Sequence, residues 1–400
     1  MASSEKIRRT DKILDERKYD KGKLVHAILT LCYDMDTKSP VLLAPLKMNV
    51  CNAATSKGTT FSKAFCDTEP YDECYMFGDM FLDGVEVLSN YIENNSLPKD
   101  RQWLFVFQKL LDFLNGNRSI NLPDTQGFES MSETERTVIV ANHLLGKLGT
   151  SSCFMIDKNF GRRKQENCFC GEESCKMTGE YGDTTIGNVE VWHGNLDVIV
   201  NSDLAVVEPL DEDSENGSDG NSAVEHCLQR NHQIIAQTIV FSFFQKKRHP
   251  ERNNFLTPCI SIRSTELRVM LYDSEHDVLL ESSSVPLFNN DSSLEFSLQA
   301  ILVCWLTVNY KYFCSGLCEE YQQHKSNFFV HVKEKIQIYE EELSLGNVGN
   351  SQLNEQKLLQ RPSNVVRSKD LRDATSGLYL CLARVSQSDC SDKRYCGLAN

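Results

Sequence analysis

The sequence has few basic residues for its length, and this deficit limits the partners that suit the chain. Its 400 residues include 42 lysines and arginines against 56 aspartates and glutamates, which gives a formal net charge of -14. Proteins that coat nucleic acid without sequence preference depend on many Lys and Arg contacts to phosphate. The composition therefore argues against non-specific coating of nucleic acid, while a local basic groove on an acidic body stays compatible with it.

Long apolar runs are also missing. The longest extends only from Leu298 to Val308, whereas a membrane-spanning helix needs about 20 such residues. The N-terminal stretch MASSEKIRRTDKILDERKYDKGK has no apolar segment of the kind found in secretory signals. We therefore expect a chain with no membrane partner that resides in the cytoplasm or the nucleus.

Paired cysteine motifs are scarce, although cysteine itself is common. The 16 cysteines are scattered, and in a reducing compartment they are expected to be free thiols. One loop, GRRKQENCFCGEESC, gathers Cys168, Cys170 and Cys175. Structural zinc usually takes four Cys or His ligands, with about two to four residues between the members of a pair. The three thiols are therefore a zinc candidate with Cys153 or His193 as the fourth ligand, and the alternative is free thiols in an exposed loop.

Signatures of several common site types are absent or incomplete. Gly146-Lys147 lacks the upstream glycine of a phosphate-binding loop, and no G-x-S-x-G nucleophile motif occurs. His193 is a candidate base or ligand, but a single histidine beside a tryptophan is more typical of a structural role. The basic run at 246–249 is predicted to be the cationic last turn of a helix, with a nuclear-import patch or a phosphate contact as alternatives.

The pattern along the chain predicts an α+β protein with four parts. Residues 1–22 are charged and expected to be flexible, and residues 23–115 show the three-to-four spacing of helices. Residues 128–343 combine helical and strand patterns around an acidic loop at 211–221, and residues 344–400 are polar and expected to be mostly disordered. Ser132 and Glu135 have the capping-box spacing that begins a helix.

The segment VEVWHGNLDVIVNSDLAVVEPL, residues 189–210, is predicted to contain two short strands joined by a turn. Each strand carries an acid, Asp197 and Glu208, among aliphatic residues where an isolated charge is costly. A turn with an even number of residues places the two acids on one face as diagonal neighbours about 7–8 Å apart. A turn with an odd number places them on opposite faces. The alternative to a paired role is that both acids simply face solvent.

Two acids on one face would suit a hard divalent cation such as Mg²⁺, which prefers oxygen ligands. A cation there can position a water molecule and stabilise charge that develops on a phosphate. The predicted acid pair is accordingly a candidate magnesium site.

The order of elements around this pair resembles that of the restriction-endonuclease-like, or PD-(D/E)XK, nucleases. A helix at 132–148 precedes a strand at 189–192 and then the strands GNLDVIV and LAVVEPL. A helix with Gln233 and Gln237 and a further strand follow. The resemblance spans residues 132–280. It implies a small mixed sheet flanked by helices, in the order αβββαβ, preceded by the N-terminal helical region.

The resemblance also implies roles for individual residues. Asp197 and Glu208 match the metal-binding acids of the family, and Gln233 or Gln237 matches a glutamine that assists in some members. The family lysine, however, is replaced by Leu210. That lysine orients the attacking water and offsets phosphate charge, and leucine can do neither.

The resemblance therefore implies a nuclease-like protein whose catalysis is lost or weakened and which keeps a binding role toward nucleic acid or protein. One alternative is an active Mg²⁺-dependent DNA or RNA nuclease whose cation has moved to Arg230, Arg263 or Lys176. A second alternative is a helical scaffold or regulatory interaction protein with no nuclease ancestry.

Overall fold

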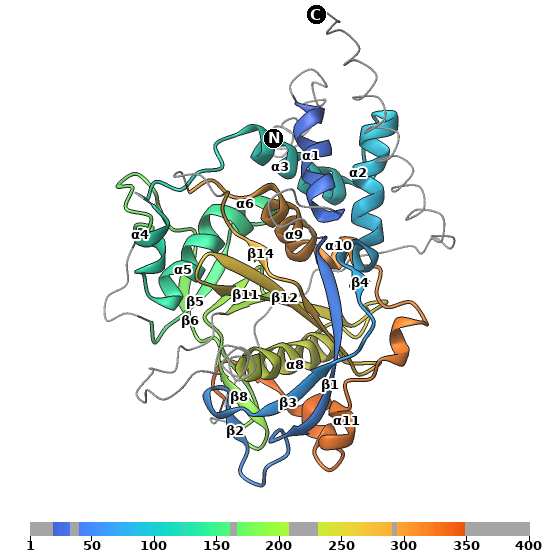
Figure 1. Ribbon diagram of the computed structural model, residues 1–400. Coiled ribbons are helices and arrows are strands. Elements are labelled where there is room, and N and C mark those ends of the chain that lie inside the picture. Colours follow the sequence, from blue (N-terminus) through green and yellow to red (C-terminus); the bar gives the residue numbers. More distant parts are fainter. Residues whose placement is uncertain are drawn as a thin grey trace, which may run out of the picture.

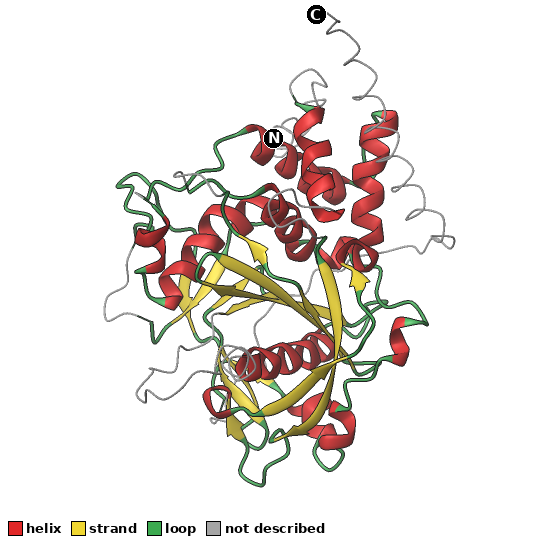
Figure 2. Ribbon diagram, in the orientation of Figure 1, coloured by secondary structure: helices red, strands yellow, loops and turns green. Residues whose placement is uncertain are grey.

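The structure is a computed structural model that describes residues 19–32, 40–122, 124–160, 166–207, 231–289 and 294–348. Helices surround a large sheet of eleven strands, and a second sheet has four strands (Figures 1 and 2). The predicted α+β class is confirmed, but the large sheet far exceeds the small one that was expected. The predicted acidic loop at 211–221 and most of the predicted tail lie outside the described residues.

The large sheet runs through the middle of the molecule in the order β3-β1-β13-β12-β11-β10-β9-β5-β6, with β4 beside β1 and β14 beside β12. Its strands are β1 (Leu42–Cys51), β3 (Cys66–Pro70), β4 (Tyr75–Met76), β5 (Phe154–Asp157), β6 (Glu180–Gly182), β9 (Val198–Val200), β10 (Leu204–Val207), β11 (Leu256–Arg263), β12 (Glu266–Asp273), β13 (Val278–Ser282) and β14 (Val285–Pro286). Parallel pairs occur at β5–β6 and β10–β11, and the other pairs are antiparallel. Parallel neighbours need a crossover connection, and α8 (Asn231–Arg248) lies in the connection between β10 and β11.

Residues 23–115 are not the mostly helical region that their spacing predicted. The helices α1 (Lys21–Cys32), α2 (Leu82–Asn94) and α3 (Arg101–Asn115) do form. Between them, however, β1 enters the large sheet and pairs with β13, which places Leu43 opposite Ser282. The helical prediction is wrong for residues 42–76, because β1 pairs with the nearby strands β3 and β4 and with β13 far along the chain.

One face of the large sheet is covered by the continuous helix formed by α5 (Glu133–Val140), η3 (Ala141–Leu145) and α6 (Gly146–Leu148), and by α9 (Leu298–Val308) with α10 (Tyr310–Phe313). The predicted capping box begins the first of these helices, since Glu135 N–H donates to Ser132 Oγ at 3.4 Å and Ser132 N–H donates to Glu135 Oε2 at 2.9 Å. Val198 and Val206 point into this side of the sheet. We call this side the α9 core.

The opposite face packs on α8. Its side chains alternate along the strands with those of the α9 core and include Ile199, Ala205 and Val207. They pack with Ile235 and Phe243 of the helix. The small sheet shares this second core and consists of β15 (Ser344–Leu345), β7 (Thr185–Gly187), β8 (Trp192–Asn195) and β2 (Thr59–Thr60), in that order. We call this side the α8 core, because α8 contacts both sheets.

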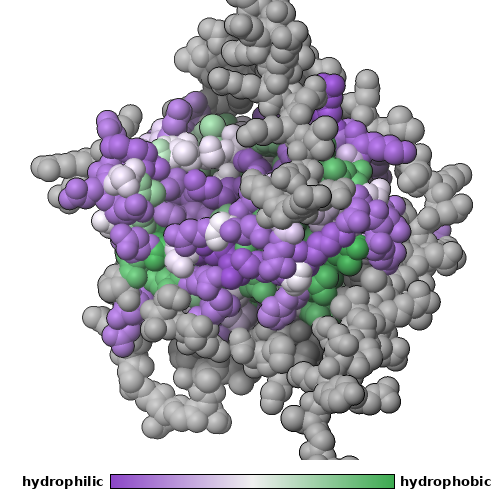
Figure 3. Space-filling model, turned by 90° about the horizontal axis from the view of Figure 1, so that it is seen from above, coloured by the Kyte–Doolittle hydropathy of each residue, from purple (hydrophilic) through white to green (hydrophobic). Residues whose placement is uncertain are grey.

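The remaining described elements are short: η1 (Phe61–Lys63), η2 (Phe77–Phe81), α4 (Thr125–Glu129), η4 (Tyr321–Gln323), α11 (Phe328–His331) and η5 (Ile338–Glu342). None of the described helices has the length and apolar character needed to cross a bilayer. Seen from the top of Figure 1, the described surface is largely hydrophilic, with hydrophobic side chains gathered in separate patches (Figure 3).

Candidate functional site

The predicted hairpin forms from β9 and β10, and its register decides the geometry of the acids. Leu204 pairs with Val200, so the loop consists of the three residues 201–203. The loop thus has an odd number of residues, whereas Asp197 and Glu208 could share a face of the sheet only with an even number. Glu208 itself lies outside the described residues, together with Pro209 and Leu210.

Asp197 instead lies opposite a different acid, Asp157 at the end of β5. β5 and β9 are antiparallel, with Ile156 opposite Val198, and the backbone N–H of Asp157 donates to the Asp197 carbonyl at 3.0 Å. In such a pairing the Cβ atoms of opposite residues are about 4.5–5.5 Å apart. The structure therefore contains a cross-strand pair of acids that the sequence reasoning did not identify.

Both acids face α8. Side chains alternate between the two faces along a strand, and Met155 and Ile199, two residues from Asp157 and Asp197, pack in the α8 core. The electrostatics agree with this placement. Burial raises the pKa of the Cys259 thiol in the α8 core to about 12, and the nearby charge of Asp197 contributes to the increase.

The helix α8 brings Gln237 to the same place. Its side chain is 1% exposed, and Nε2 donates to the Asn195 carbonyl at 3.1 Å. Asn195 in turn donates through Nδ2 to Asp157 Oδ2 at 2.7 Å. The Gln237 Oε1 atom is buried and has no hydrogen-bond partner among the residues that the structure describes. Of the two predicted glutamines, Gln237 thus contacts the segment that leads into β9, while Gln233 lies one turn earlier with a partly exposed side chain.

This arrangement has the ligand chemistry of a hard cation. A buried amide oxygen without a partner costs about 1–3 kcal/mol. A divalent cation would offset this cost, because carboxylate and amide oxygens are the ligands that Mg²⁺ and Ca²⁺ take. Asp157, Asp197 and Gln237 are the described residues that would hold it.

The cations predicted as substitutes for the missing lysine have other positions. Lys176 donates through Nζ to Asn167 Oδ1 at 2.6 Å, and the side chain of Arg263 at the end of β11 is exposed. Arg230 lies outside the described residues. No described contact places Lys176 or Arg263 beside Asp197.

The basic run at the end of α8 has a structural role in the described fold. Lys246, Lys247 and Arg248 each donate to a backbone carbonyl, at 3.2, 3.0 and 3.2 Å respectively. These contacts confirm the prediction that the run is the cationic last turn of a helix, where cations also interact favourably with the helix dipole.

A second cluster forms where the sequence predicted zinc. The Sγ atoms of Cys168, Cys170 and Cys175 and a ring nitrogen of His143 all lie within 4.8 Å of one another. Cys168 and Cys170 are buried, and Cys175 and His143 are partly buried. Burial raises the pKa of the Cys168 thiol to about 12. Without a nearby cation Cys168 is therefore poorly suited to nucleophilic catalysis, which requires a thiolate.

Neither of the two predicted fourth ligands belongs to this cluster. His193 lies in β8 of the small sheet, where its Nδ1 is 2.9 Å from the Val191 carbonyl oxygen, and Cys153 is an exposed thiol ahead of β5. His143 takes their place. It was missed because it lies within a helix that precedes the cysteines by 25 residues, so that no local spacing connects it to them.

Comparison with models of protein families, with curated proteins and with solved structures finds no match to this chain. What the chain does must therefore be inferred from two features of the described residues, the acid pair beside Gln237 and the thiol cluster at His143.

Proposed function

We propose that the chain is a nuclease-like protein with a restriction-endonuclease-like core that does not hydrolyse phosphodiesters and acts by binding nucleic acid or protein. The order α5, β5, β9, β10, α8, β11 supports this proposal, because these elements follow the αβββαβ order that the resemblance implies, with β6, β7 and β8 inserted between β5 and β9. The strand that the resemblance placed at 189–192 is not part of this core, since β8 lies in the small sheet, and β5 takes its position. The strand directions also fit a mixed sheet, since β5–β9 and β9–β10 are antiparallel and β10–β11 is parallel. This sequence of elements is the observation that carries the proposal.

Three features favour the loss of hydrolysis. Leucine stands at position 210, where the family has lysine, and Pro209 precedes it. The three-residue loop between β9 and β10 lacks the register that would direct Asp197 and position 208 to one face. Hydrolysis of a phosphodiester needs a positioned water molecule and a cationic group that stabilises the developing charge, and leucine cannot supply that group.

A divalent cation remains compatible with this function. Asp157 and Asp197 retain carboxylates on the α8 side of the sheet, and the Gln237 Oε1 atom is available to a ligand. When bound, the cation would supply positive charge for contact with a phosphate. We therefore expect metal binding without cleavage.

The first prediction is that the purified full chain cleaves neither DNA nor RNA in Mg²⁺ or Mn²⁺. Mn²⁺ binding, measured by calorimetry or by the loss of the free Mn²⁺ resonance signal, is expected to weaken at least about tenfold in Asp197→Ala, because one of two carboxylate ligands is lost. Glu93→Gln is the matched control, since Glu93 is an exposed acid on α2, and it should bind Mn²⁺ like the wild type.

Cleavage by the wild type that disappears in Asp197→Ala and persists in Glu93→Gln would contradict the proposal. That result would establish the working nuclease with a relocated cation. Cleavage that persists unchanged in Asp197→Ala would instead indicate a contaminating nuclease.

A further inference from the structure

We propose that His143, Cys168, Cys170 and Cys175 form a structural zinc site that fastens the loop 166–178 to the helix α5–η3–α6. The proposal rests on the geometry of these four side chains and does not depend on the nuclease-like ancestry of the core.

The loop is folded so that its first and last thiols meet. Asn167 and Lys176 form an antiparallel bridge, and the Cys168 N–H donates to the Cys175 carbonyl at 2.9 Å. Gly171 turns the chain between them with a φ of +78°, a left-handed conformation that favours glycine. The loop is therefore a short hairpin with its three thiols gathered at one position.

The helix provides the fourth ligand through a local irregularity. His143 lies in η3, a π-helical turn between α5 and α6. Its Nε2 atom lies 3.2 Å from Cys168 Sγ and 3.6 Å from Cys175 Sγ. Single π-helical turns re-aim side chains and occur frequently at functional sites. The turn thus directs the imidazole toward the hairpin.

These distances fit tetrahedral zinc. Zn–S bonds of about 2.3 Å and Zn–N bonds of about 2.0–2.1 Å place two sulfur atoms about 3.8 Å apart, and a nitrogen about 3.6 Å from each sulfur. The observed nitrogen–sulfur distances of 3.2 and 3.6 Å lie close to this value. The largest separation in the group, within 4.8 Å, needs a contraction of only about 1 Å to reach the tetrahedral geometry.

The four donor atoms favour zinc over Mg²⁺ and Ca²⁺, and their number favours a structural site. Three thiolates and one imidazole are soft and intermediate ligands, whereas Mg²⁺ and Ca²⁺ take oxygen. Four protein ligands leave no position for a water molecule or a substrate, which is the arrangement of structural zinc. The chain would therefore use two kinds of cation at two places, a hard one at Asp157 and Asp197 and zinc at the thiol cluster.

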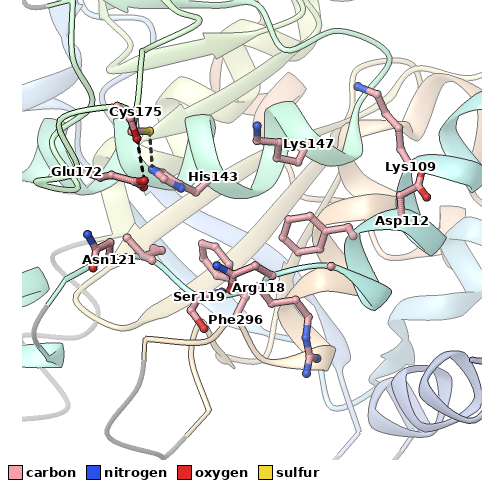
Figure 4. Close-up of a pocket in the computed structure, with 15 residues that line it drawn as sticks. Lys109, Asp112, Arg118, Ser119, Asn121, His143, Lys147, Glu172, Cys175 and Phe296 are labelled. Carbon is pink, nitrogen blue, oxygen red and sulfur yellow. Dashed lines mark hydrogen bonds between the residues drawn. The ribbon is translucent and has the colours of Figure 1, made fainter.

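The site also has an access route and a structural purpose. His143 and Cys175 line a surface pocket of about 770 Å³, which Lys109 and Lys147 also line (Figure 4). The hairpin contains a single bridge and few backbone hydrogen bonds of its own, so zinc would supply much of its stability.

Asn142, the neighbour of His143, holds the hairpin from outside the ligand set. Its Nδ2 atom lies 3.6 Å from Cys175 Sγ, and its Oδ1 accepts from the Thr178 N–H at 3.1 Å. We predict that Asn142→Ala keeps one zinc per chain but weakens zinc affinity about 10–100-fold, as loss of such supporting contacts usually does. Competition with a chromophoric chelator measures this change, and unaltered affinity would contradict the predicted role.

The site itself is tested on the full chain, purified under reducing conditions and analysed by plasma mass spectrometry. We expect about one zinc per chain in the wild type and in Cys153→Ser, which removes an exposed thiol outside the cluster. Cys175→Ser is expected to lower the zinc content at least about tenfold. Replacing zinc by Co²⁺ should give the tetrahedral bands and the sulfur-to-cobalt charge-transfer band of a three-thiolate site.

If removal of a zinc ligand also unfolds the chain, the variant His143→Cys still tests the site. This variant retains four ligands, so it should keep zinc while the cobalt charge-transfer intensity rises by about one third, from three thiolates to four. The proposal is overturned if the reduced wild type carries less than about one zinc per ten chains and gives no cobalt charge-transfer band. It is also overturned if Cys175→Ser retains full zinc.

Discussion

Replacing Asp203 with alanine is expected to lower the free energy of unfolding by about 3–5 kcal/mol at pH 7. Asp203 ends the loop between β9 and β10, and its side chain is 12% exposed. One carboxylate oxygen accepts from Arg252 Nη2 at 3.0 Å, and the other accepts from Lys311 Nζ at 3.1 Å. The alanine variant would leave these two cations facing each other in a largely buried site, which is the costly way to break an ion pair.

The loss of stability caused by Asp203→Ala should depend on pH. Burial alone would raise the pKa of the Asp203 carboxyl, but Lys311 and Arg252 outweigh burial and lower it. A carboxyl with a lowered folded pKa contributes stability that is present above its unfolded pKa of about 3.9 and is lost as the pH falls through the folded pKa. The difference between wild type and variant should therefore be full at pH 7 and shrink below about pH 4.

Urea denaturation followed by circular dichroism measures both effects. Glu69→Ala is the control, because Glu69 pairs with Lys47 at 3.4 Å while the side chains of Lys47 and Glu69 are 40% and 54% exposed. Exposed ion pairs contribute little to stability, so this variant should change the free energy of unfolding by less than about 1 kcal/mol. A loss of similar size in the two variants would refute the role assigned to Asp203.

Trp305→Ala is expected to lower the free energy of unfolding by about 3–5 kcal/mol, the usual range for removing a large buried aromatic side chain. Trp305 is fully buried on α9, and its indole Nε1 donates to the Val106 carbonyl of α3 at 2.9 Å. Its ring centroid lies 4.5 Å from that of Phe313 and 6.4 Å from that of Phe107. The substitution therefore removes both apolar contacts and a hydrogen bond between α9 and α3.

The same variant tests whether residues 23–115 form a separate unit. Because α3 and the large sheet share the α9 core, loss of the Trp305 side chain should lower the unfolding midpoints of helices and of the sheet by the same amount, in one transition. Phe105→Ala is the matched control on α3, since Phe105 is 45% exposed, and it should cost less than about 1 kcal/mol. Two separate transitions, with only one shifted, would show that the N-terminal region folds on its own.

Local sequence signals were sufficient for part of the fold. The two strands of the hairpin, β9 and β10, and the capping box at Ser132 were predicted correctly, because each depends on residues close together in the chain. β1 was missed for the opposite reason. A helix precedes it, and one of its two main partner strands, β13, lies far along the chain, while β3 pairs with its other edge.

The hairpin loop shows a finer limit of the sequence. A turn with an even number of residues was one alternative, yet the loop has three residues, and both Asn201 and Ser202 adopt positive φ values, of 53° and 62°. Serine rarely adopts this conformation, so the sequence did not indicate it. One additional loop residue reverses which face every following side chain occupies.

The candidate sites were identified only in part for a similar reason. Asp197, Gln237 and the three cysteines were found from motifs, whereas Asp157 and His143 were not. Asp157 lies in a segment that shows no strand pattern, and His143 lies in a helix that only the tertiary fold brings to the cysteines. A contact between residues distant in the chain has no local signal, and this limited the prediction of both sites.

The pairing of β1 with β13 has a consequence for synthesis on the ribosome. The hydrogen bond from the Leu42 N–H to Ser283 Oγ joins residues 241 positions apart. At usual translation rates β1 would wait roughly 10–50 s for its partner to emerge. During that time β1 could pair with β3 and β4, but its edge toward β13 would stay unpaired, a state prone to aggregation. Nascent chains arrested before residue 278 should therefore depend on chaperones far more than the finished protein does.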